Sequence, residues 1–271
     1  MNRIGIKFLS LVIGVSMLFV SCSEDSENAG NPPELPPKAS LSANLGTFPQ
    51  NGDGRVDETQ TKTNFAFSAI NVGFWQTAIG VVIFIPAKAF EAAFNQDFQY
   101  LSDEKRWKSE YTVNVNNQAV TAQLFAKNNG ETVSWEMYLS AEGQYEDFLW
   151  FTGESRVDNS GGDWVLYGGP SEPREVLRID WDREGDNFIH SKYVLVDTES
   201  AKSGSFVEYG LSTEADFSHY YEIFVVDTQG DDYDAHILYN ETSTEGRVKS
   251  EAHFGDADWR CWDENQDDID C

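Results

Sequence analysis

The segment WKSEYTVNVNNQAVTAQLFAKNNGETVSWEMYL (107–139) decides the fold of this chain. Within 107–115 the larger apolar side chains fall on every second position, and the same alternation returns in 132–139. A period of two is that of a strand with one buried face. The intervening Asn116-Asn117 and Asn129-Gly130 pairs are turn formers that tolerate positive φ. The segment therefore predicts three antiparallel strands joined by tight turns.

The same pattern continues towards the C-terminus. Eight more segments, each bounded by Gly, Asp, Asn or Ser, predict strands at 148–152, 163–167, 176–181, 188–196, 205–209, 219–226, 235–239 and 247–253. We therefore expect an all-β domain of about eleven or twelve strands. Such an antiparallel meander hides its edges either as a closed barrel or as a strongly curved sheet.

The most apolar stretch after residue 22 is 64–85, which precedes these strands. It contains Asn71, Gln76 and two glycines, Gly73 and Gly80, which argue against a lipid-facing membrane helix. We expect two strands here, paired around 73–76 and buried on both faces. Pro86 then precedes AKAFEAAFN, whose Ala, Lys and Glu predict one short helix that packs on or across the sheet.

Residues 1–22, MNRIGIKFLSLVIGVSMLFVSC, combine a basic tip with an apolar run and end on Ser21 and Cys22. This segment resembles a bacterial lipoprotein signal, which implies cleavage before Cys22 and acylation of its thiol. The alternative is a transmembrane anchor, but the apolar run of 4–20 is shorter than the ~20 residues that a spanning helix needs.

The acidic SEDSEN that follows Cys22 resembles the export signal of Bacteroidota surface lipoproteins. That resemblance implies a lipid-anchored protein on the outer membrane that faces the cell surface; a solvated acidic tether is the alternative. No family resemblance is evident for the folded part. We expect a signal peptide over 1–21, a lipidated, Pro-rich disordered tether over 22–44, and a single β domain over 45–271.

Charge and cysteine content narrow the possible partners. The formal net charge is −27, and cleavage of the signal removes Arg3 and Lys7 but no acidic residue. Such a surface repels nucleic acid and anionic headgroups, so we expect membrane contact through the lipid anchor alone. With Cys22 acylated, Cys261 and Cys271 remain, and we predict that they form a disulfide that closes the C-terminal tail; two free thiols are the alternative.

Two acidic segments contain oxygen ligands at alternating positions, as a Ca²⁺ loop requires. In the tail, Asp263, Asn265 and Asp267 alternate, with Asp270 behind them, and they resemble the start of an EF-hand-like loop that lacks its glycine and its final acid. The second segment is a partial match at 51–57. Solvated acidic loops are the competing interpretation, and Ca²⁺ is the only cofactor that the sequence suggests.

The sequence contains few features that are typical of a catalytic site. There is no Gly-x-Ser-x-Gly turn and no His-Glu-x-x-His helix, and the predicted registers keep the four histidines apart. Asp180 and Asp182 share one face of a predicted strand and could serve a polymer-acting hydrolase. A turn near Gly185 would place Asp180 opposite His190, so a cross-strand charge pair explains them more simply. We therefore predict a protein that is not an enzyme.

The predicted strands also carry many aromatic side chains, on one strand after another. They include Trp150, Trp164, Tyr167, Trp181 and Tyr193, which we take as candidate ligand-binding residues, with core packing as the alternative. In the strand at 148–152 aromatic residues occupy both faces, which indicates either a ligand surface or a covering element. The function predicted from the sequence is non-enzymatic binding of a small apolar ligand, a glycan or a protein. A Ca²⁺-stabilised structural or adhesive module is a further alternative.

Overall fold

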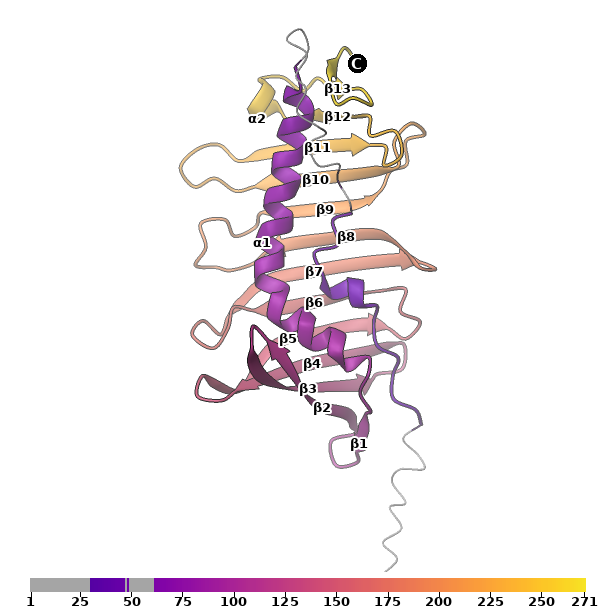
Figure 1. Ribbon diagram of the computed structural model, residues 1–271, viewed down its shortest axis with the longest axis vertical. Coiled ribbons are helices and arrows are strands. Elements are labelled where there is room, and N and C mark those ends of the chain that lie inside the picture. Colours follow the sequence, from indigo (N-terminus) through magenta and orange to yellow (C-terminus); the bar gives the residue numbers. More distant parts are fainter. Residues whose placement is uncertain (1–29, 47, 49–60) are drawn as a thin grey trace, which may run out of the picture.

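The computed structural model describes residues 30–46, 48 and 61–271. The lipoprotein signal, Cys22 and the acidic segment 51–57 lie outside these residues. The described chain forms one antiparallel sheet of 14 strands, in which each strand pairs with the next along the sequence (Figure 1). β1 and β14 are its two edges, so the predicted meander is confirmed as a curved open sheet and not as a closed barrel.

The strands are β1 (Gln99–Leu101), β2 (Arg106–Val115), β3 (Gln118–Asn128), β4 (Thr132–Ala141), β5 (Tyr145–Arg156), β6 (Gly161–Tyr167), β7 (Glu175–Glu184), β8 (Asn187–Leu195), β9 (Phe206–Leu211), β10 (His219–Val225), β11 (Tyr233–Tyr239), β12 (Gly246–Lys249), β13 (Arg260–Trp262) and β14 (Asp268–Ile269). The first predicted turn is confirmed, because Asn116 and Asn117 have φ values of 51° and 65°. The predicted strand 247–253 ends early, at Lys249, and the short helix α2 (Glu251–Phe254) follows.

The apolar stretch is a helix, so the prediction of two strands around 73–76 is wrong. Helix α1 (Thr63–Ala93) has 31 residues and includes Pro86, so the separate short helix predicted after Pro86 is part of this longer helix. Its buried side chains recur every three or four residues, as one face of a helix requires: Phe65, Ser68, Val72, Trp75, Ile79 and Ile83. Figure 1 shows the axis of α1 bending towards its C-terminal end, as a proline inside a helix favours.

The C-terminal tail caps the N-terminus of α1. The Asp268 carboxylate accepts hydrogen bonds from the backbone N–H groups of Thr63 and Asn64, both at 3.0 Å. These N–H groups have no partner within the helix, and a negative charge there also complements the helix dipole. The predicted disulfide between Cys261 and Cys271 is present and closes the tail, with 5.2 Å between the two Cα atoms.

Residues 35–46 and 48, which we call the strap, cross the same face of the sheet beside α1 (Figure 1). The strap contains the 3₁₀ helix η1 (Lys38–Leu41). Hydroxyl and indole groups of the sheet hold its backbone and Ser40: the Trp164 indole donates to the Ser40 hydroxyl, and the Tyr221 hydroxyl donates to the Leu45 carbonyl. The packed part of the chain begins near Leu35, about ten residues before the predicted start of the β domain at 45.

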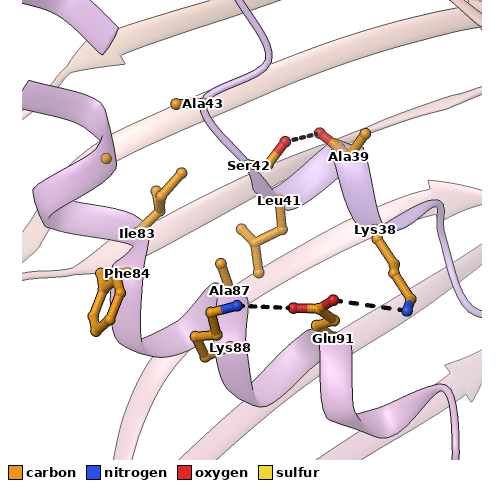
Figure 2. Close-up of a pocket in the computed structure, with 11 residues that line it drawn as sticks. Lys38, Ala39, Leu41, Ser42, Ala43, Ile83, Phe84, Ala87, Lys88 and Glu91 are labelled. Carbon is orange, nitrogen blue, oxygen red and sulfur yellow. Dashed lines mark hydrogen bonds and ion pairs between the residues drawn. The ribbon is translucent and has the colours of Figure 1, made fainter. Parts of the chain in front are cut away.

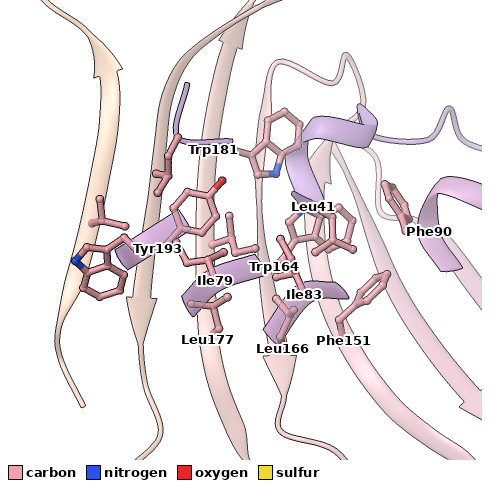
Figure 3. Packing of buried hydrophobic residues seen from close by; sticks show 14 of the residues in the cluster. Leu41, Ile79, Ile83, Phe90, Phe151, Trp164, Leu166, Leu177, Trp181 and Tyr193 are labelled. Carbon is pink, nitrogen blue, oxygen red and sulfur yellow. The ribbon is translucent and has the colours of Figure 1, made fainter. Parts of the chain in front are cut away.

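Between the sheet, α1 and the strap lies one continuous hydrophobic core. Figure 3 shows strand residues such as Trp164 and Tyr193 packed against Ile83 and Phe90 of α1 and Leu41 of the strap. The core therefore joins three segments that are far apart in the sequence, and α1 and the strap together cover one face of the sheet. We call this the covered face and the other the open face.

Tyr193→Phe is expected to weaken the attachment of the strap. The Tyr193 hydroxyl donates to the Ser42 carbonyl at 2.7 Å and accepts from the Asn44 N–H at 2.9 Å. Its loss leaves two backbone groups without partners, which should lower the free energy of unfolding by about 1–3 kcal/mol. Urea unfolding measures this loss, and hydrogen exchange at Asn44 should accelerate. The control is Tyr138→Phe, because the Tyr138 hydroxyl donates only one hydrogen bond, to the Glu136 carboxylate at 3.3 Å, and holds no backbone group of the strap. Equal losses in both variants would contradict the expectation.

Candidate functional site

An apolar groove runs between the strap and α1 (Figure 2). Its volume is about 420 Å³. It is lined by Lys38, Ala39, Leu41, Ser42 and Ala43 of the strap and by Gly80, Ile83, Phe84, Ala87, Lys88 and Glu91 of α1. We call it the strap groove. Leu41 and Ile83 are buried, whereas Phe84 is partly exposed. A Cβ atom added to Gly80 would meet no atom within 4 Å, so this glycine leaves open space in the groove.

One end of the strap groove is positively charged. The Lys88 ammonium lies 3.2 Å from the Glu91 carboxylate, and the Lys38 ammonium approaches the same carboxylate from the strap at 3.9 Å (Figure 2). Two cations thus share one anion, in a chain whose net charge is −27. All three side chains are about half exposed, so this end can accept an anionic group from solvent.

Helix α1 also carries a row of exposed apolar side chains, which we call the α1 ridge. It consists of Ile70, Phe74, Val81 and Phe84, which are 71%, 64%, 75% and 43% exposed. Large apolar side chains gathered on an exposed surface commonly mark a site of interaction. By length and composition alone α1 could cross a membrane, but a third of its most apolar window is buried in the core.

A second groove, of about 450 Å³, lies beside α1 at Val81, Val82 and Ile85. Its other wall comes from the sheet and includes Trp150 and Tyr167, two of the five aromatic residues predicted to bind a ligand. The other three, Trp164, Trp181 and Tyr193, are buried in the core beneath the covering segments. Among the alternatives drawn from the sequence, these three therefore fit core packing under a covering element.

The predicted metal ligands of the tail are engaged locally. One oxygen of Asp263 accepts the backbone N–H groups of Asn265 and Asp267, while Asp267 lies 3.7 Å from the Lys62 ammonium. Asp270 is in the exposed disulfide-closed loop. In the described part of the chain, the tail aspartates do not converge into a group of three potential ligands. The Ca²⁺ interpretation stays a prediction.

Asp180 and Asp182 lie on the open face of β7, but the predicted register is wrong by two residues. Asp182, not Asp180, is opposite His190, because the turn is Gly185-Asp186 and a bulge follows Asp182. Asp163 is opposite Asp180, and burial, together with the charges of Asp180 and Glu154, raises the pKa of the Asp163 carboxyl. These acids border a small cavity of about 230 Å³.

The strap groove was not predicted from the sequence, since one wall was assigned to a disordered tether and the other to two strands and a separate short helix. The signal that could have revealed it is Leu41, a large apolar residue in the polar segment that precedes the domain. Chemically, the groove combines an apolar channel with a cationic end, and its one hydroxyl group, that of Ser42, donates to the Ala39 carbonyl. Comparison of the chain with protein-family models, curated proteins and solved structures gives no match.

Proposed function

We propose that this protein is a non-enzymatic, lipid-anchored protein of the outer membrane that binds a single-chain anionic amphiphile, such as a fatty acid, in the strap groove. The lipoprotein-like signal at Cys22 and the acidic residues behind it support the location. The observation that carries the binding role is the strap groove itself, which is apolar along α1 and cationic at the end formed by Lys38 and Lys88.

The size of the groove agrees with this ligand class. Small-molecule sites commonly measure about 300–1,000 Å³, and the groove has about 420 Å³. Each methylene group removed from water contributes about 0.8 kcal/mol, so a chain that buries six of them gains roughly 5 kcal/mol before the costs of association. A carboxylate headgroup can then pair with Lys38 or Lys88 in exchange for Glu91.

A glycan is the weaker candidate of the ligands considered. Sugar binding uses exposed aromatic faces and many hydrogen-bonding groups, whereas Trp164, Trp181 and Tyr193 are buried. The strap groove is lined mainly by aliphatic side chains and one phenylalanine. A hydrolase that uses Asp180 and a Ca²⁺-stabilised module both stay predictions without further support from this groove.

A photoreactive long-chain fatty acid tests the proposal on the full chain in detergent. We expect cross-links, mapped by mass spectrometry, on the strap peptide around 38–43 and on α1 around 80–88. Phe84→Ser removes apolar contact worth about 1.5–3 kcal/mol when fully covered, so the cross-link yield at limiting probe should fall by about tenfold or more. Ile70→Ser with Phe74→Ser is the matched control, because these residues are more exposed but line neither groove.

The headgroup is tested by competition. A fatty acid should displace the probe better than the fatty alcohol of equal chain length, and Lys38→Gln with Lys88→Gln should abolish that preference. Lys105→Gln with Lys127→Gln is the control for loss of positive charge elsewhere. Cross-links that survive Phe84→Ser unchanged would contradict the proposal. A dimer in light scattering that dissociates on Ile70→Ser with Phe74→Ser would replace it, because the α1 ridge would then bind a second copy.

A further inference from the structure

The open face of the sheet carries a concentration of negative charge that the proposed ligand does not use. Glu154, Asp163 and Asp180 stand directly opposite one another on β5, β6 and β7. Like charges in direct cross-strand pairs destabilise a sheet, so an acidic row of this kind is costly unless a cation offsets it. Next to this row, β8 contributes His190, a residue type that binds transition metals.

Asp180, Asp182 and His190 bring three potential ligand atoms together, all within 4.8 Å of one another. The Nδ1 atom of His190 lies 3.5 Å from Oδ1 of Asp180 and 3.9 Å from Oδ2 of Asp182. This nitrogen is buried and has no hydrogen-bond partner. It is therefore a desolvated polar atom that points at two carboxylates, on an otherwise half-buried side chain.

The other ring nitrogen also faces a carboxylate. His190 Nε2 lies 3.4 Å from Oε1 of Glu208. Glu208 is itself held by Lys192, at 3.0 Å, and by the hydroxyl of Tyr220, at 2.9 Å. A neutral ring that directs its Nε2–H group at Glu208 leaves the Nδ1 lone pair facing two carboxylates. Metal-binding histidines commonly have this arrangement, in which a carboxylate orients the ring from behind.

Arg156 orients one of the carboxylates. Its guanidinium donates to Oδ1 of Asp182 at 2.8 Å, and the other oxygen of Asp182 is the one that faces His190. This pair depends on Gly161, because a Cβ there would lie 2.1 Å from Arg156 Nη1 and 2.4 Å from Asp182 Oδ1. The backbone of β6 therefore leaves the space in which Arg156 holds Asp182.

We propose that Asp180, Asp182 and His190 form a Zn²⁺ site on the open face of the sheet, with the fourth position open to water or to an external ligand. Oxygen and imidazole ligands together suit Zn²⁺ better than Ca²⁺, which prefers oxygen alone. Tetrahedral ligands at about 2.1 Å from Zn²⁺ lie roughly 3.4 Å apart, close to the distances at His190. Binding requires only a small inward movement of the two carboxylates.

Calorimetric titration of the chelator-treated full chain with Zn²⁺ tests this site. A Cys22→Ser background removes the thiol outside the Cys261–Cys271 disulfide, since a thiolate would compete for Zn²⁺. We expect one Zn²⁺ per chain. Affinity should fall by about tenfold or more in Asp180→Asn and in His190→Ala, and by about 10–100-fold in Glu208→Gln, which acts as a positioning residue.

His236→Ala is the matched control, because His236 is also on the open face and stands opposite an acid, Glu222. It should bind Zn²⁺ as the parent does. Circular dichroism and urea unfolding establish that each variant is folded. Three results would overturn the proposal: no Zn²⁺ binding by the folded parent, equal affinity in the parent and His190→Ala, or a preference for Ca²⁺ that survives His190→Ala.

Discussion

Trp164→Ala is expected to lower the free energy of unfolding by about 3–5 kcal/mol, the range found for large aromatic residues truncated in cores. The Trp164 side chain is 0% exposed. Its ring contacts Phe90 of α1 and Phe151 of β5, with ring centroids 5.5 Å and 5.1 Å away. Its indole N–H donates to the Ser40 hydroxyl of the strap at 3.2 Å. The substitution therefore weakens the sheet, the helix and the strap together.

Urea unfolding followed by circular dichroism measures the loss. Trp259→Ala is the control, because it removes an equally large side chain that is only partly buried and stacks on Arg247 and Lys249. Exposed cation–π contacts contribute about 0.5–1 kcal/mol, so this variant should lose far less stability. If the two variants lost equal stability, Trp164 would not be the point at which the three segments are joined.

Trp164 also illustrates which features of the fold the sequence can predict. Strand alternation depends on local sequence, so the period of two in 107–115 predicted the meander, and the Asn116-Asn117 pair predicted its first turn. Whether an alternating aromatic residue faces a ligand or a core depends on what covers the sheet. That cover comes from Leu41 and from α1, which are distant in sequence, and no local pattern connects them with Trp164.

The helix was missed for a different reason. Apolar residues occur all round α1, including the exposed Ile70 and Phe74, so the helical period of its buried face is hidden. Gly73 and Gly80 also suggested that a regular element ends at each of them. Both lie within the helix, at positions where an added Cβ atom would meet open space. The strap groove could not be predicted without this helix.

The proximity of Asp180, Asp182 and His190 on the open face was partly predicted from the sequence. Asp180, Asp182 and His190 were assigned to neighbouring strands, and the error was a register shift of two residues. The two-residue turn Gly185-Asp186 accounts for one residue of this shift, and the bulge after Asp182 accounts for the other, without a reliable sequence signal. The role of Glu208 required the pairing of β8 with β9, where Lys192 faces Glu208.

Replacing Cys261 and Cys271 by serine is expected to cost about 2.5–3 kcal/mol. The bond closes a loop with a sequence separation of 10 residues, and the chain-entropy estimate for a loop of that length gives this value. The loop contains Asp268, whose carboxylate caps α1. Release of the tail should therefore also free the first turn of the helix, which urea unfolding and hydrogen exchange at Thr63 and Asn64 can detect.

A double-mutant comparison tests whether loss of the disulfide acts on helix α1 through the Asp268 cap or only on the tail itself. Asp268→Ala in the oxidised chain should cost about 1 kcal/mol, because it removes both oxygens that accept from Thr63 and Asn64. In the serine variant the tail is held less firmly, so Asp268→Ala should cost measurably less, and the two changes should not add. Strict additivity would mean that the cap stays in place without the disulfide. Non-additivity would show that a covalent bond at the C-terminus fixes the start of the helix on which the strap groove is built.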